Sequence, residues 1–75
     1  MLIEINELVL KTNNPPKTKT HWLNPSYISE IIPKDVAALT ANGWNCEGIT
    51  DLYLLTTTSS ESFFIDRDSF LRAKK

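Results

Sequence analysis

The residues best suited to nucleophilic catalysis are the single histidine, His21, and the single cysteine, Cys46. A catalytic pair would need the imidazole within hydrogen-bond distance of the thiol, so that it can take up the thiol proton. The two residues lie far apart in the sequence, and the negative charge of Glu47, next to the cysteine, disfavours a thiolate. We therefore expect an ordinary strand histidine and a small, partly buried thiol.

Paired carboxylates are the other candidates, because two carboxyl groups can share acid–base work. Asp66 and Asp68 are two positions apart, and Glu47 and Asp51 are four apart. A helix cap or a solvated turn explains each pair better than catalysis does. One cysteine and one histidine cannot supply the usual ligands of a zinc site, and two glycines are too few for a phosphate loop. The sequence therefore predicts no catalytic residue, no metal, no cofactor and no enzymatic activity.

Nucleic-acid binding is a more credible function, because basic residues gather near one aromatic residue. Lys11, Lys17, Lys19 and His21 surround the first loop, and Trp22 follows them. A basic hairpin with an aromatic side chain can follow a phosphate backbone and stack on a base. Against this, nine acidic residues outnumber eight lysines and arginines, giving a net charge of −1. A nucleic-acid-binding module that uses the basic loop Lys11–His21 is thus the alternative function.

Large aromatic side chains are plentiful for so short a chain, which favours protein binding. Phe63 and Phe64 are adjacent, so on a strand they point to opposite faces, and one ring is free unless both faces are covered. Trp44 lies in a turn-rich segment and is a candidate hot spot, although it could instead fold over the core as a lid. Trp22 is interpreted as structural. The predicted partner contacts are Trp44, Tyr53, Phe63, Lys17 and Lys19.

The first half of the chain predicts an antiparallel strand pair. Leu2–Lys11 alternates apolar and polar residues, with a phase slip near Asn6–Glu7 that a β-bulge could absorb. A helix is the competing interpretation, but β-branched residues are frequent and no N-cap precedes the run. The prolines of Lys11–Lys17 make that segment a loop. We expect Thr18–Leu23 to return as the second strand.

The middle of the chain is broken by turn-forming residues. Asn24–Ser26 ends the second strand, and Tyr27–Ile32 then suits either one helical turn or a short buried strand that Pro33 terminates. Asp35 can cap a short helix that closes at Asn42–Gly43 in left-handed geometry. A mobile loop is the alternative for this segment.

The last third predicts a hairpin followed by a helix. Ile49–Thr57 and Ser62–Asp66 have strand composition, and the polar turn Thr58–Glu61 separates them. Either Asp66 or Asp68 can cap the final helix. The expected fold class is mainly β (α+β): a small antiparallel sheet or SH3-like barrel with one or two short helices.

Two parts of the chain resemble a group of small bacterial and phage proteins that includes the flagellar FlbD family. Trp22–Ile31 has their leucine–asparagine–proline turn followed by spaced isoleucines, and Asp51–Leu55 with Phe63–Asp66 has their hairpin and acidic step into a helix. The loop Asn13–Lys19 is longer than in that pattern, and Lys34–Gly48 looks inserted. The resemblance implies a small β-rich accessory protein of phage or bacterial origin without an active site.

Length and composition limit how the chain can be stabilised. Seventy-five residues permit one domain, 1–75, and such a domain buries only about 60% of its unfolded surface. With no disulfide and no metal, we expect a homo-oligomer or a bound protein partner. Unpaired cysteine fits the cytoplasm, and we expect neither a signal peptide nor a membrane span. The predicted function is a non-enzymatic protein-binding accessory or inhibitor module.

Overall fold

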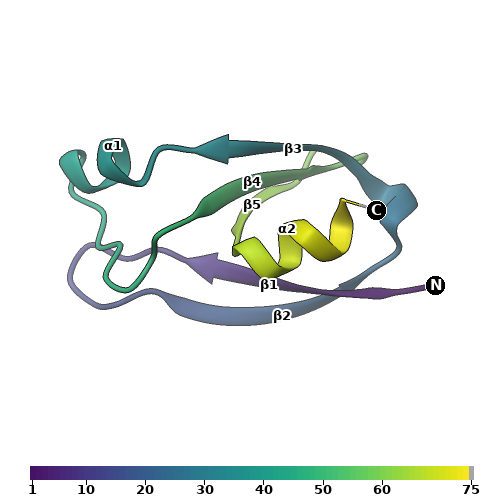
Figure 1. Ribbon diagram of the computed structural model, residues 1–75, viewed down its shortest axis with the longest axis horizontal. Helices are drawn as coiled ribbons and strands as arrows, with labels where there is room; N and C mark the ends of the chain where they lie inside the picture. The colour runs from purple at the N-terminus through teal and green to yellow at the C-terminus, as the bar shows by residue number, and fades with distance from the viewer. Residues whose placement is uncertain (75) are drawn as a thin grey trace.

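Five antiparallel strands and a C-terminal helix dominate the computed structural model, which describes residues 1–74 (Figure 1). The sheet has the order β2-β1-β5-β4-β3 and is open, so β2 and β3 are its two edges. A short 3₁₀ turn, η1, joins these two edge strands. The predicted class, mainly β with one or two short helices, is confirmed as an open antiparallel sheet with two short helices. The elements are β1 (Ile3–Val9), β2 (Lys17–Leu23), η1 (Pro25–Tyr27), β3 (Ile28–Lys34), α1 (Val36–Ala41), β4 (Leu52–Thr57), β5 (Ser62–Ile65) and α2 (Arg67–Ala73).

The β1–β2 hairpin confirms the strand interpretation of the first segment. Its register runs without a shift from the pair Ile3–Leu23 to the pair Val9–Lys17, so the bulge expected near Asn6–Glu7 is not formed. The phase slip in the sequence has another cause. Leu8 is half-buried on the face opposite the fully buried Ile5, so both faces of β1 carry apolar residues.

The segment after η1 is a strand and not a helical turn. Asn24 begins η1, because its side-chain Oδ1 accepts a hydrogen bond from the backbone N–H of Ser26 at 3.0 Å. The expectation that Pro33 ends this segment is wrong, since β3 continues to Lys34 and Pro33 pairs with Tyr53 of β4. An edge strand tolerates proline because its outer side needs no hydrogen-bond donor.

The two predicted helix starts are confirmed at their capping residues. Asp35 accepts a hydrogen bond from the backbone N–H of Ala37 at 3.0 Å and begins α1. Gly43 follows that helix with φ +97°, the left-handed conformation that glycine adopts without strain. Of the two candidates for the last helix, Asp66 is the cap, because its carboxylate accepts from the backbone N–H of Ser69 at 2.8 Å. Neither α1 nor α2, the helices found within residues 1–74, has the length and hydrophobicity to cross a membrane.

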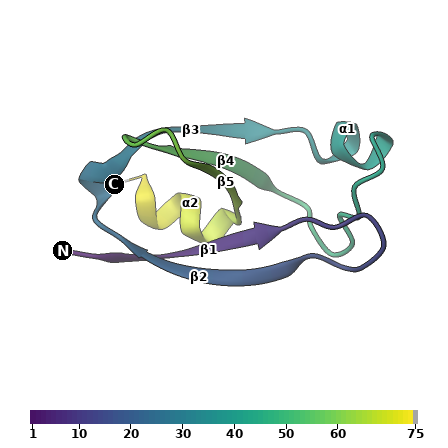
Figure 2. The ribbon, with the colours of Figure 1, turned by 180° about the vertical axis from the view of Figure 1, so that it is seen from behind.

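Helix α2 packs on the concave inner face of the sheet and completes the core. Ile5, Leu55 and Ile65 are fully buried, and Phe70 and Ala73 of α2 pack against them. Figures 1 and 2 show α2 between the β1–β2 hairpin and the β3–β4 pair. The small core is therefore closed by one helix, without a barrel forming.

Side chains of α2 also bond to backbone groups of β1 where no neighbouring strand is present. Strand β5 is short and pairs with β1 only between Glu7 and Ile65. Beyond that pair, the backbone N–H of Asn6 donates to Ser69 Oγ at 2.7 Å, and Arg72 Nε donates to the carbonyl of Glu4 at 2.8 Å. These two backbone groups of β1 are thus hydrogen-bonded although no strand lies beside them.

Candidate protein-binding surface

The structure separates the predicted contact residues into exposed and enclosed groups. Trp44 is 40% exposed and lies in the connection between α1 and β4. That connection is tied to the first loop, because the backbone N–H of Asn45 donates to the carbonyl of Lys11 at 2.8 Å. Trp44 therefore lies at the same end of the molecule as the start of β2, where Lys17 is found (Figure 1). The predicted hot spot is accessible.

Tyr53 and Phe63 are both engaged in packing within the protein. The ring of Tyr53 stacks on Phe70 of α2 with 4.1 Å between centroids. Phe63 stacks on His21 at 4.7 Å and packs against the core cluster. Both residues are only half-exposed, so they stabilise the attachment of α2 and of the β1–β2 hairpin more directly than they offer surface to a partner.

This difference gives a stability prediction for the aromatic residues. Phe63→Ala should lower the free energy of unfolding by about 2–3 kcal/mol, somewhat less than a fully buried phenylalanine would, because it removes both the stack on His21 and the core contact. Trp44→Ala should change it by less than about 1 kcal/mol, because the side chain is exposed. Urea unfolding of both variants measures the two values. Equal losses would mean that Trp44 is a lid on the core after all.

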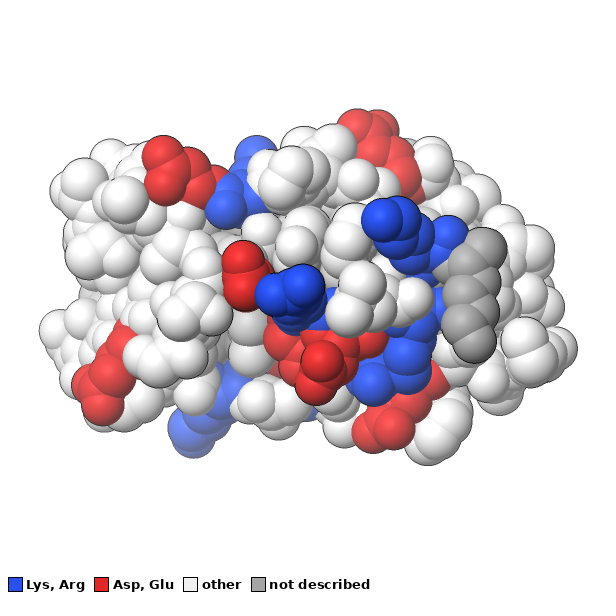
Figure 3. All heavy atoms as spheres, viewed as in Figure 1, with Lys and Arg blue, Asp and Glu red and all other residues white. Residues whose placement is uncertain are grey.

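Lys17 and Lys19 lie on the outermost strand, exposed and on one face of β2. Lys17 is opposite Val9 and Lys19 is opposite Glu7 in the hairpin register. Trp22 projects from the other face, because strand residues of odd and even number point to opposite sides. A nucleic-acid strand lying on one face of β2 could not contact these lysines and also stack on Trp22. On the face drawn in Figure 3, acidic and basic side chains are intermixed without a large area of one sign.

The start of β1, η1 and the end of α2 lie at the other end of the molecule (Figures 1 and 2). Exposed apolar side chains are found at this end. Trp22 is 62% exposed there, opposite Glu4 in the register, and Leu2 and Tyr27 are each 58% exposed. A groove of about 560 Å³ opens at the same end, and its lining is mostly apolar: Met1, Leu2, Ile3, Glu4, Pro25, Arg72 and Ala73. We call this surface, with Trp22 and Tyr27, the apolar end.

The apolar end was missed at the sequence level, since Trp22 was interpreted as structural. One signal does point to its exposure. Lys17, Thr18, Lys19 and Thr20 precede the tryptophan, so both faces of this strand carry polar residues. A strand that is polar on both faces fits the edge of a sheet, where neither face is fully covered, and a tryptophan on it is then exposed.

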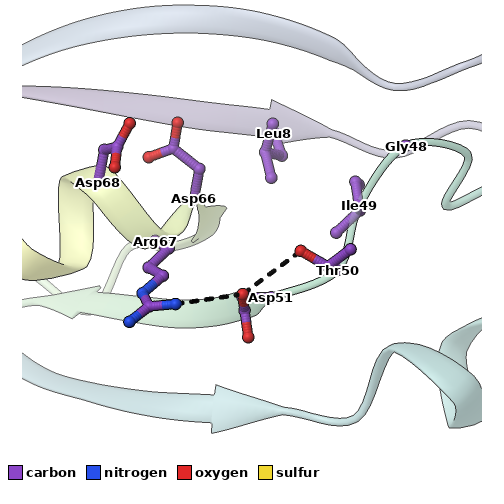
Figure 4. Close-up of a pocket in the computed structure, with 8 residues that line it drawn as sticks. All are labelled: Leu8, Gly48, Ile49, Thr50, Asp51, Asp66, Arg67 and Asp68. Atoms are coloured by element: carbon purple, nitrogen blue, oxygen red, sulfur yellow. Dashed lines mark hydrogen bonds and ion pairs between the residues drawn. The ribbon is translucent and has the colours of Figure 1, made fainter.

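A second pocket is lined by several charged residues, and their interactions stabilise the fold (Figure 4). Asp66 is the cap of α2. Asp51 Oδ2 lies 4.0 Å from Arg67 Nη1 and accepts a hydrogen bond from the Thr50 hydroxyl. Asp68 lies in the first turn of α2, where its negative charge interacts favourably with the helix dipole. Within residues 1–74, no three metal-binding side chains are grouped closely enough to hold a metal ion.

His21 and Cys46 are not brought together. His21 Nε2 lies 2.7 Å from Glu7 Oε1, and its ring is held against Phe63. His21 pairs with Ile5 on β1, whereas Cys46 follows Asn45, which pairs with Lys11. Ile5 and Lys11 are six residues apart, roughly 20 Å along an extended chain. The thiol and the imidazole therefore do not form a dyad.

The chain was also compared with known proteins. No protein-family model matches it, and no match is found among curated proteins or among solved structures.

Proposed function

We propose that this protein is a non-enzymatic module that binds another protein through its apolar end, as an accessory or inhibitor. The observation that carries the proposal is Trp22, 62% exposed at the same end of the molecule as a groove with a mostly apolar lining. Exposed apolar patches of this kind mark interaction surfaces, and tryptophan is the residue most often found at interface hot spots. The proposed phage or bacterial origin is supported by the FlbD-like sequence pattern alone.

The size of the apolar end bears on the kind of complex it can form. The molecule measures 36 × 20 × 18 Å, so the projected area of an end face is about 20 by 18 Å. That area is less than half of the roughly 800 Å² that each partner buries in a stable interface. A second copy meeting end to end would therefore bind weakly, and a stable partner must extend along a side of the molecule.

The proposal is tested by comparing variants at the two ends of the molecule. Trp22→Ala, at the apolar end, is expected to weaken partner binding by at least about thirtyfold, the effect of losing a hot-spot side chain. Trp44→Ala is the matched control, because it removes the same side chain from the opposite end. Both variants, immobilised and exposed to a nuclease-treated bacterial lysate, are compared with the unmodified protein by quantitative mass spectrometry.

The expected result is a set of proteins retained by the unmodified protein and by Trp44→Ala but lost from Trp22→Ala. Circular dichroism checks that both variants stay folded, which the exposure of both side chains leads us to expect. The proposal fails if Trp22→Ala retains the same proteins as the unmodified protein. Light scattering over a dilution series tests the homo-oligomer expectation separately.

A further inference from the structure

The outer side of β2 carries unpaired backbone groups whose direction can be derived. In an antiparallel strand the N–H and C=O of one residue point to the same side, and successive residues alternate. Asn6 N–H and Glu4 C=O bond to side chains of α2, so they point away from β2. The register partners of Asn6 and Glu4 are Thr20 and Trp22. The backbone N–H and C=O of these two residues must therefore point away from β1, and by alternation so must those of Thr18. The free edge thus presents a regular row of donors and acceptors.

The opposite edge of the sheet is blocked, whereas this one is not. Strand β3 contains Pro33, and its register with β4 shifts between Ile28 and Glu30. Proline and irregular pairing are devices that prevent strand addition. Strand β2 has no proline, and its register with β1 is continuous over seven residues. Nothing lies beyond β2 in either ribbon view (Figures 1 and 2).

Side chains on β2 determine which strand could add there. Lys17 and Lys19 are exposed on one face, and neither forms an ion pair within residues 1–74. Lysines at an edge oppose pairing with a neutral or basic strand, because their charges would be partly desolvated. Acidic residues directly opposite them would compensate this cost, since opposite charges on facing strands attract. Trp22, on the other face, offers an apolar contact.

We propose that the outer edge of β2 binds an extended acidic segment of the partner protein by β-strand addition. The proposal rests on the protein-binding function above. The edge of β2 would supply the additional contact area that the apolar end is too small to provide. Main-chain hydrogen bonds to Thr18, Thr20 and Trp22 supply affinity, and side chains at alternate positions supply specificity. An antiparallel segment has an apolar residue opposite Trp22, then acidic residues three and five positions later, opposite Lys19 and Lys17.

The test uses a synthetic peptide with leucine at the apolar position, glutamate at both acidic positions, and threonine or valine elsewhere. Its binding to the purified protein is measured by fluorescence anisotropy. A peptide with lysine in place of both glutamates is the charge control. We expect the acidic peptide to bind at least about tenfold more tightly, since two opposite-charge pairs become two like-charge pairs.

Thr20→Pro tests the edge itself. The N–H of Thr20 points outward, so proline removes no hydrogen bond of the β1–β2 ladder, and an edge strand tolerates it. The proline lacks the central donor and its ring obstructs the incoming strand, so binding of the acidic peptide should fall at least about tenfold. Thr20→Val is the matched control, because it also loses the Thr20 hydroxyl hydrogen bond to Asn6 but keeps the N–H.

An independent measurement covers the case in which Thr20→Pro does not fold. Methylating the peptide nitrogens that face β2 removes its donors while the protein stays unmodified, and this too should abolish binding. The inference is overturned if the methylated peptide binds as well as the parent, if Thr20→Pro stays folded and binds unchanged, or if the unmodified protein binds neither peptide. A dimer that Thr20→Pro dissociates would mean that a second copy occupies the edge, which also overturns it. If the acidic peptide does not bind but capture of partner proteins from the lysate still depends on Trp22, the strand-addition inference fails and the proposed protein-binding function is retained.

Discussion

Ile65→Ala should destabilise the protein more than any other single truncation considered. Ile65 is fully buried and lies where β5 meets both β1 and β4. Removing a buried isoleucine side chain costs about 2–5 kcal/mol, because apolar contacts are lost and a cavity remains. A domain of this size has a total stability of only about 4–11 kcal/mol. The variant is therefore expected to have a much lower urea midpoint, and its core is too small to absorb the cavity by repacking.

Two controls make this result interpretable. Ile65→Val keeps most of the volume and should cost only about 0.5–1.5 kcal/mol. Leu71→Ala removes a similar side chain from α2, but that leucine is 47% exposed, so the free energy of unfolding should change by less than about 0.5 kcal/mol. If Leu71→Ala destabilises as strongly as Ile65→Ala, the described packing of α2 against the sheet is wrong.

Ser69→Ala should also destabilise the protein clearly, although it removes a single oxygen atom. Ser69 is fully buried, and its Oγ accepts hydrogen bonds from the Asn6 backbone N–H at 2.7 Å and from Arg72 at 3.3 Å. Alanine leaves the Asn6 N–H without a partner at the junction of helix and sheet. An unsatisfied buried donor costs about 1–3 kcal/mol, and we expect a loss of stability within that range.

Hydrogen exchange distinguishes this cause from general loosening. In Ser69→Ala the amide proton of Asn6 should exchange faster, while the amide of Leu55 in the core should change only with global stability. Ser62→Ala is the matched control, because within residues 1–74 the exposed Ser62 hydroxyl on β5 bonds only to Thr56 of β4. Unchanged protection of Asn6 would show that Ser69 is not the hydrogen-bond partner that protects the Asn6 N–H.

The two helix caps and the hairpin turns were predictable because their signals are local. Asp35 and Asp66 accept hydrogen bonds from backbone N–H groups two and three residues ahead, so each cap is encoded within one turn of chain. The Asn24–Pro25 step likewise ends β2 wherever the strand lies in the sheet. By contrast, the segment with Pro33 was predicted to stop too early, because proline is tolerated only at an edge and the strand order was not yet known.

The sequence by itself determined the strands, the breaks between them and the scarcity of reactive groups, because alternation, turn residues and composition act over a few neighbouring positions. Only the tertiary structure decided which aromatic side chains are covered. Tyr53 and Phe63 are enclosed because α2 and the β1–β2 hairpin pack over them, and Trp22 is exposed because β2 is the last strand of the sheet. Exposure depends on which distant segments meet. The polar residues before Trp22 indicate an edge strand, but no local pattern at Tyr53 or Phe63 shows that these rings are covered.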